Sequence, residues 1–376
     1  MRISLFSLLK PGALHVRLAS GAGAFVDSGR LGGSRQIGPG DQARIRLVGD
    51  RLSILLVDAY GRIKHSVSAE QVSIIPQGRA TFYLVVPGKI DREVRGALSV
   101  RAPVAQARGG LKITLATDLE SVVASVVAAE LVGMREAEAI KTLAVIARTF
   151  MLSHAGRHRD EGFDFCDTTH CQLYKGEADP VVARAASETS GEVLGFGGHT
   201  INAYFTAVCG GLSATPEAVW GGTPVNGYVY ERVACAWCRQ SPYMKWERRA
   251  EADQVLDALS AAKGTRFSSS AEIATEEAGP SGPVRRVIIL DKGRRVVMGT
   301  EEFRRAIGLH IGWNRVLSPT FQVERRGRLL VFRGRGFGSQ VGLCLAGTSA
   351  QAVAGRSYRD ILKYYFPGTE INRRQE

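Results

Sequence analysis

Short apolar runs separated by turn-forming residues fill the N-terminal part of the chain. The runs are rich in residues that favour strands, and Gly, Asp or Pro stands between them, as at Gly38-Pro39-Gly40. The pattern predicts a β-rich domain over residues 1–115, with a first strand over residues 3–9. Further strand-like runs include Ala13–Leu18, Ala43–Val48, Leu52–Val57, Ala80–Val86 and Ala97–Val100.

The pattern changes at about Asp118, after which a long stretch contains no Pro and one Gly, Gly133. Asp118 is a good N-cap, and the Val and Ala residues that follow make the first helix apolar on nearly all sides, as in a buried helix. Gly133 ends this helix, and a second one is predicted from about Arg135, because apolar residues recur there at three- and four-residue spacing. Lys141 and Arg148 lie seven positions apart, on one face of the second helix.

Loops, short helices and strands alternate over the rest of the chain, so the predicted fold class is α+β. Residues 264–283 are rich in Ser, Thr, Glu and Gly and are expected to form an exposed connector. Helices are predicted at 181–188, Ala250–Ala262, Thr300–Ile307 and Ser349–Tyr365, and strands at Gly191–Leu194, Ile201–Ala207, Val284–Leu290, Val296–Met298, Thr320–Glu324 and Leu329–Phe332. Four parts follow: the β-rich domain 1–115, a core with the buried helix pair over 116–225, an α/β insertion or second domain over 226–315, and a β-containing C-terminal part over 316–376 that completes the core.

Composition narrows the class of partner without choosing one. The 376 residues are 45% hydrophobic, which excludes wholesale disorder, and no apolar run has the length of a transmembrane span. The formal net charge of +13 favours an anionic partner such as nucleic acid, a membrane surface or an acidic cell-wall polymer. No nucleic-acid-binding motif supports the first of these, and the short apolar stretch near the N-terminus is no clear signal peptide.

Glu130 is the first candidate for catalysis. It follows Val126-Val-Ala-Ala at the end of the predicted buried helix, just before the break. A carboxyl group in apolar surroundings has a raised pKa, which suits a general acid near neutral pH. The alternative is an ordinary, partly exposed glutamate at a helix end.

Cysteine and histidine residues form two further candidate sites. One cluster contains His154, His158, Cys166, His170 and Cys171, which suits zinc, although a Cys166–Cys171 disulfide or free thiols explain the cysteines equally well. The second is Cys235-Ala-Trp-Cys238 with Cys209 upstream, which favours a metal half-site or a structural disulfide over redox catalysis.

Glycine and aromatic residues add weaker signals. The run Gly334-Arg-Gly336-Phe-Gly338 lacks the GK[ST] ending of a phosphate loop, so a close backbone approach or a β-bulge is expected there. Tyr174, Tyr204, Trp220 and Trp246 could stack on sugar rings or simply fill cores.

Several of these stretches, taken in order, resemble the stage II sporulation protein D (SpoIID) family, which includes the LytB-type amidase enhancers. The resemblance covers about residues 110–370. The blocks that carry it are Val126–Leu131, Glu138–Phe150, Phe165–Gly176, Tyr204–Gly211, Val219-Trp220, Ser241–Trp246, Gly334–Cys344 and Ser357–Gly368.

The resemblance implies a peptidoglycan lytic transglycosylase of the cell envelope. It acts on glycan strands stripped of stem peptides, and Glu130 matches the family's catalytic glutamate, which serves first as acid and then as base. The family also implies a structural Zn²⁺ ion, with Cys166, His170, Cys171 and His158 as ligands. The residues implied to bind substrate are Lys141, Arg148, Gln172, Tyr174, Tyr204, Gly210, Gly211, Trp220 and Ser339.

The C-terminal stretch departs from the family's usual Gly-His-Gly-Val-Gly-Leu-x-Gln-x-Gly ending. Ser339 takes the His position, Gln340 the next Gly position and Leu345 the Gln position. The departures keep a second function open, that of a non-catalytic wall-binding protein that enhances an N-acetylmuramoyl-L-alanine amidase. Nucleic-acid binding would rest on charge alone.

Overall fold

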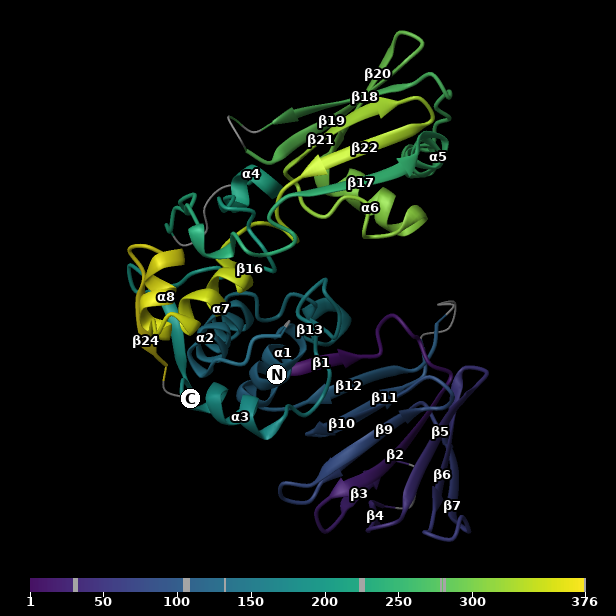
Figure 1. Ribbon diagram of the computed structural model, residues 1–376. Helices are drawn as coiled ribbons and strands as arrows, with labels where there is room; N and C mark the ends of the chain where they lie inside the picture. The colour runs from purple at the N-terminus through teal and green to yellow at the C-terminus, as the bar shows by residue number, and fades with distance from the viewer. Residues whose placement is uncertain are drawn as a thin grey trace. The chain divides into compact units, whose positions relative to one another are not determined.

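The computed structural model describes residues 1–29, 33–103, 109–131, 133–222, 227–277, 279 and 282–374 (Figure 1). Helices and strands are both abundant, which confirms the predicted α+β class. The chain divides into two compact units. Unit 1 contains Met1–Leu131 and Met151–Ser190, and unit 2 contains Val132–Phe150 and Gly191–Glu376.

Unit 1 is built on two antiparallel-rich sheets, as the apolar runs of its sequence predict. One sheet has the order β13-β1-β12-β11-β8-β3-β4 and the other β10-β9-β2-β5-β6-β7. Buried and exposed residues alternate along strands such as β5, so each sheet turns an apolar face inward. The strands are β1 (Arg2–Leu5), β2 (Ala13–Ser20), β3 (Ala24–Asp27), β4 (Arg35–Ile37), β5 (Gln42–Val48), β6 (Arg51–Val57), β7 (Ile63–Ala69), β8 (Gln71–Pro76), β9 (Thr81–Val86), β10 (Ile90–Arg95), β11 (Ala97–Arg101), β12 (Lys112–Ala116) and β13 (Phe165–Cys166).

Helix α1 (Leu119–Glu130) begins where the sequence predicts. The Asp118 carboxylate accepts a hydrogen bond from the Ser121 backbone N–H, and Val122 to Val127 are buried. Gly133, at φ +85°, follows the helix, and α2 (Ala137–Ser153) begins four residues later. In unit 1, α3 (Pro180–Ser187) contacts α1, and a short 3₁₀ turn, η1 (Arg159–Glu161), precedes β13.

Unit 2 combines small sheets with the remaining helices. β14 pairs with β15 and β24, β16 pairs with β23, and two three-stranded sheets have the orders β17-β22-β21 and β18-β19-β20. Helices α5 and α6 pack on the latter strands around a shared apolar core that includes Phe303 and Phe332 (Figure 1). The elements are β14 (Glu192–Phe196), β15 (His199–Thr200), β16 (Phe205–Thr206), α4 (Pro216–Trp220), η2 (Ala236–Cys238), β17 (Trp246–Glu251), α5 (Ala252–Lys263), β18 (Glu272–Glu277), β19 (Val284–Asp291), β20 (Arg294–Gly299), α6 (Thr300–Ile311), β21 (Phe321–Arg326), β22 (Leu329–Gly334), β23 (Leu343–Cys344), α7 (Leu345–Val353), α8 (Tyr358–Tyr365) and β24 (Glu370–Arg373).

Four predicted elements are wrong in extent. The strand predicted over Ile201–Ala207 is reduced to β16 at Phe205–Thr206. The first strand ends at Leu5, because Phe6 takes a positive φ of 55° and starts a turn. The single helix predicted over Ser349–Tyr365 is two helices, since Gly355 (φ +83°) ends α7 and Ser357 caps α8. The predicted connector 264–283 contains β18, which pairs with β19.

Within the described residues, no helix combines the length and the apolar character that crossing a membrane requires.

A buried ion pair joins the cysteine-bearing loop of unit 1 to its sheets. Asp167 Oδ2 accepts hydrogen bonds from Phe6 N (2.7 Å) and Arg92 Nη1 (2.8 Å), and its Oδ1 accepts one from Ser7 N (3.1 Å). The side chains of Asp167 and Arg92 are 4% and 10% exposed. Removing one partner of such a pair leaves a charge and two N–H groups without their acceptor.

We therefore expect Asp167→Ala to lower the free energy of unfolding by about 3–5 kcal/mol. The matched control is Asp164→Ala, which removes an exposed bond to Arg2 N and is expected to cost less than about 1 kcal/mol. Urea unfolding of the whole chain measures both. Equal losses for the two variants would show that the ion pair does not anchor the loop.

Candidate functional site

Glu130 is the last residue of α1, at the end of the helix whose preceding turns are buried. Desolvation by the surrounding protein raises the pKa of its carboxyl group above the ordinary value, and the positive charge of Lys175 opposes part of that shift. Glu130 is thus a half-buried carboxyl group whose proton is retained at higher pH than that of a solvated glutamate.

Lys175 is held beside α1 by its own backbone. The Ser125 hydroxyl, inside the apolar stretch of α1, accepts hydrogen bonds from both Lys175 N and Gly176 N at 3.0 Å. Gly176 has φ +104°, and a Cβ there would lie 2.2 Å from Glu93 O, so only glycine fits. Sequence reasoning missed Lys175 and Ser125, although both stand inside or beside the blocks that carry the family resemblance.

The two other predicted substrate residues of unit 1 lie inside the protein. Tyr174 is 2% exposed, and the Arg92 guanidinium lies 6.0 Å from the centre of its ring. Gln172 is 8% exposed. Their burial indicates that Gln172 and Tyr174 stabilise the loop that carries Lys175 and do not face a ligand.

The Cys/His loop brings together four of the five residues predicted as a cluster. Atoms of His158, Cys166, His170 and Cys171 all lie within 4.8 Å of one another. His158 Nε2 is 3.2 Å from Cys171 Sγ, and His170 Nδ1 is 3.6 Å from Cys171 Sγ and 3.7 Å from Cys166 Sγ. Cys166 and Cys171 are free thiols, and a hydrogen bond from Cys171 lowers the pKa of Cys166 to about 4.

This donor set fits zinc. Two thiolates and two imidazoles are a common tetrahedral ligand set, and Nδ1 of His158 is bonded to the Glu161 carboxylate. A carboxylate on the far nitrogen of a histidine ligand fixes the ring for metal binding. The remaining histidine, His154, is hydrogen-bonded to Ser153 and is not part of the group.

In unit 2, Lys141 and Arg148 share a face of α2 but differ in their surroundings. Lys141 Nζ bonds Glu138 Oε1 at 2.9 Å, and Glu138 Oε2 accepts from Tyr358 N at 2.8 Å. Arg148 has no exposed surface, and its Nη1 donates to Glu192 O at 3.0 Å. Arg148 therefore braces α2 against β14 and has no solvent-facing surface for a ligand.

Aromatic rings gather around Tyr204 and Trp220 in unit 2, whereas the other two sugar-stacking candidates, Tyr174 and Trp246, are buried elsewhere. The ring centres of Tyr204 and Trp220 lie 5.0 Å apart, and Tyr230 is 6.1 Å from Tyr204 and 4.8 Å from Tyr228. Trp220 is 46% exposed at the end of α4. We call Tyr204, Trp220, Tyr228 and Tyr230 the aromatic cluster.

Positive φ angles and close neighbouring atoms explain the predicted glycine positions. Gly210 has φ +71°, and a Cβ there would lie 2.7 Å from Gly336 N. Gly211 has φ +90° and faces Met244 at similar range. The expected close approach at Gly334–Gly338 is confirmed, since a Cβ on Gly336 would lie 2.7 Å from Val208 O.

Gln340 shows what one departure from the family ending does. Its φ of 64° lies in the left-handed region, which glycine adopts without strain. The side chain is buried, and its Nε2 donates to Cys209 O and Arg335 O at 2.9 Å while Oε1 accepts from Thr320 Oγ1 at 2.6 Å. These bonds offset the backbone strain. Ser339, next to it, accepts from Val341 N through its hydroxyl.

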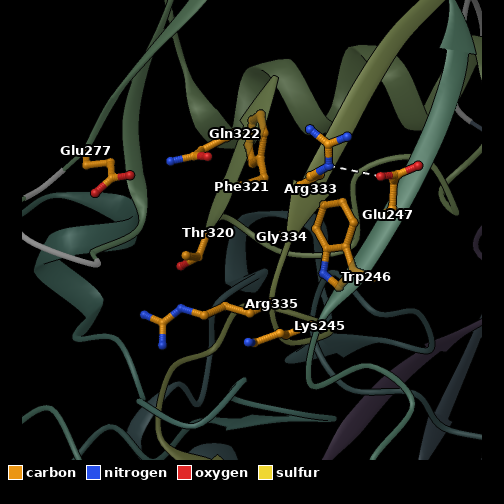
Figure 2. A pocket seen from close by; sticks show the side chains of 10 residues that line it. All are labelled: Lys245, Trp246, Glu247, Glu277, Thr320, Phe321, Gln322, Arg333, Gly334 and Arg335. Atoms are coloured by element: carbon orange, nitrogen blue, oxygen red, sulfur yellow. Dashed lines mark hydrogen bonds and ion pairs between the residues drawn. The ribbon is translucent and has the colours of Figure 1, made fainter. Parts of the chain in front are cut away.

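A hollow of about 580 Å³ lies between β17, β21 and β22 of unit 2. Lys245, Arg333 and Arg335 line it with the Trp246 ring, and Arg333 is paired with Glu247 (Figure 2). Burial lowers the pKa of Arg335. Its size and mixed basic and apolar lining are those of a small-ligand site. Trp246, one of the four sugar-stacking candidates, lines it, and none of the substrate residues that the resemblance implies does.

Comparisons with known proteins agree with the resemblance. The SpoIID family model, described as stage II sporulation protein, matches residues 107–196, the range that holds Glu130, Lys175 and the Cys/His loop. Stage II sporulation protein D of Bacillus subtilis (strain 168) is 28% identical over 273 residues, which cover 68% of this chain and 74% of that protein. The amidase enhancer of the same organism is 25% identical over 281 residues, or 62% of this chain and 38% of the enhancer. An uncharacterized protein of Brachyspira hyodysenteriae is 26% identical over 238 residues, 62% of this chain and 61% of its own length.

The Cys/His loop yields a direct prediction. Cys171→Ser removes one of four ligands, so purified protein should lose one zinc ion per chain relative to wild type by elemental analysis. Thr168→Ala, in the same loop, keeps all four ligands and should keep the ion. A Cys166–Cys171 disulfide found by peptide mapping of protein purified without reductant would refute the metal site.

Proposed function

We propose that this chain, which belongs to the family of stage II sporulation protein D and the amidase enhancer, is a peptidoglycan lytic transglycosylase. Its substrate is the MurNAc-GlcNAc glycan strand denuded of stem peptides, and its product carries a 1,6-anhydro-MurNAc end. Such a protein acts in the cell envelope. The observation that carries the proposal is Glu130, half-buried at the end of α1, where desolvation raises the pKa of its carboxyl group.

Glu130 performs both proton transfers. Because burial favours its neutral form, the carboxyl group can donate a proton to the glycosidic oxygen as the bond to the leaving sugar breaks. The carboxylate that results takes the proton of the muramoyl 6-hydroxyl, whose oxygen closes the anhydro ring on the anomeric carbon. The proton balance of Glu130 is restored at the end of the cycle.

One carboxyl group is enough for this reaction. A typical glycoside hydrolase needs a second carboxylate, either as nucleophile or to activate water. Here the nucleophile is the 6-hydroxyl group of the substrate, so the proposed chemistry needs no carboxylate besides Glu130. Lys175 stabilises the anionic form of Glu130 between the two transfers.

The remaining predicted residues take supporting parts in the proposal. Trp220 and Tyr204, two members of the aromatic cluster, stack on sugar rings of the glycan. Lys141 donates hydrogen bonds to polar groups of the glycan. A zinc ion on the Cys/His loop is structural, because it fixes Cys171 four residues before Lys175. Gly210, Gly211 and Ser339 lie in unit 2, as the aromatic cluster does. In the proposal they set the local backbone conformation and take no part in proton transfer.

Glu130→Gln removes the transferable proton and keeps the side-chain shape. We expect the yield of anhydro-muramoyl products from denuded strands, measured by mass spectrometry, to fall by about 10²–10⁴-fold. The matched control is Glu120→Gln in the first turn of the same helix, which should keep most of the activity. Undiminished products from Glu130→Gln, or none from wild type, would reject the proposal.

Lys175→Met tests the electrostatic setting of Glu130. The acid form of Glu130 reacts, so the rate falls as pH rises through its pKa. Because Lys175 lowers that pKa, its removal should move the falling limb of the kcat/KM profile to higher pH. Lys89→Met removes an exposed lysine elsewhere in unit 1 and should leave the limb in place. A limb that stays put or moves to lower pH in Lys175→Met would contradict the assignment.

A second function, enhancement of a cell-wall amidase, is favoured by the similarity to a protein named amidase enhancer and by Ser339 and Leu345 in the C-terminal ending. In that case Glu130→Gln protein would still bind walls and stimulate an amidase. Lack of any effect of wild-type protein on amidase turnover would exclude it.

A further inference from the structure

Four cysteines that the proposed function does not use converge in unit 2. Cys209, Cys235, Cys238 and Cys344 are all buried, and their four sulfur atoms lie within 4.8 Å of one another. We propose that these residues form a second, four-thiolate zinc site that joins three distant segments of the chain.

The fold brings the four sulfurs together from elements that are far apart in the sequence. β16 and β23 pair in parallel, with Thr206 opposite Cys344, which places the segment after β16 beside the end of β23. Cys235 and Cys238 stand at the two ends of η2, which contacts α7. Backbone bonds close the arrangement, since Cys235 N donates to Gly211 O at 2.9 Å.

The spacing of the sulfurs fits a tetrahedral metal better than disulfides. Cys209 Sγ and Cys238 Sγ are 3.6 Å apart, and all four cysteines are free thiols. Zinc–sulfur bonds of about 2.3 Å place the corners of a tetrahedron roughly 3.8 Å apart, whereas bonded sulfurs lie about 2.05 Å apart. Four thiolates in a tetrahedron are a typical structural zinc site.

Donors around the sulfurs suit thiolates. Cys344 Sγ accepts from Cys209 N at 3.3 Å and from Gly347 N at 3.4 Å, in the first turn of α7, where the helix dipole favours negative charge. The Tyr365 hydroxyl lies 3.2 Å from Cys235 Sγ and can donate to it. A Cβ on Gly347 would lie 2.8 Å from Cys235 Sγ, so glycine leaves the space that this packing requires. Such outer contacts are typical of metal-bound sulfur.

The site would fix more than the cysteines. Gly210 O, next to Cys209, accepts a hydrogen bond from Arg335 Nη1 at 3.2 Å. Cys209 O accepts one from Gln340 Nε2 at 2.9 Å. Arg335 lines the basic hollow of unit 2. A metal at the four cysteines therefore holds one wall of that hollow in place.

Zinc content tests the proposal without depending on catalysis. Wild-type protein should contain two zinc ions per chain, Cys171→Ser one, and Cys344→Ser one. In Cys171→Ser, which leaves the four cysteines of unit 2 intact, X-ray absorption at the zinc edge should show a shell of sulfur only. This measurement holds even where Cys344→Ser does not fold.

Four results would overturn the site. They are a Cys171→Ser protein without zinc, a nitrogen or oxygen ligand in its metal shell, a metal other than zinc at the four cysteines, or a disulfide among those cysteines in protein alkylated and mapped without reductant. Ser213→Ala, a buried polar change near η2 that spares every sulfur, is the control and should keep both ions.

Discussion

The burial of helix α1 is the constraint on which the proposed chemistry depends. Residues 122–127 of the helix are buried, and the carboxyl group of Glu130 at its end is half-buried and therefore only partly solvated. Desolvation there favours the proton on Glu130, and a single charge, that of Lys175, limits the effect. Ser125, the polar residue in the middle of this apolar helix, places the lysine by binding its backbone and that of Gly176. Helix α1 thus positions both the proposed acid, Glu130, and the positive charge of Lys175.

Contacts between segments that are distant in the sequence hold the functional loops of both units in place. In unit 1 the buried Asp167–Arg92 pair fastens the Cys/His loop to the sheets. In unit 2 the proposed zinc site at the four cysteines would connect distant segments in the same way. The Gln340 side chain also makes hydrogen bonds to Cys209 O, Arg335 O and Thr320 Oγ1. Loops that carry function need such fixed points, because their own backbones make few regular hydrogen bonds.

Local sequence signals were sufficient where the structure is local. Asp118 and Gly133 predict the bounds of α1 closely, and the Cys/His loop closes over thirteen residues, so spacing indicated the cluster, while the choice of four ligands came from the family resemblance. Sequence patterns were not sufficient where packing between distant segments determines the surroundings of a side chain. Cys344 could not be joined to Cys209, 135 positions earlier in the chain, because only the pairing of β16 with β23 brings the two segments together. Spacing put Arg148 on the face of Lys141, yet only the packed fold shows that its guanidinium is buried. In the sequence Gln340 is only a departure from the family's glycine, and its three side-chain bonds become visible only in three dimensions.

The origin of the oxygen in the product tests the central claim most directly. Denuded glycan strands would be digested by wild-type protein in water labelled with heavy oxygen, and the new ends analysed by mass spectrometry. If the muramoyl 6-hydroxyl is the nucleophile and Glu130 the sole acid and base, the new ends are anhydro sugars that carry no label. Labelled reducing ends would show that water attacks and that a second group activates it, and intact strands would show that the chain does not cleave them; either result contradicts the account.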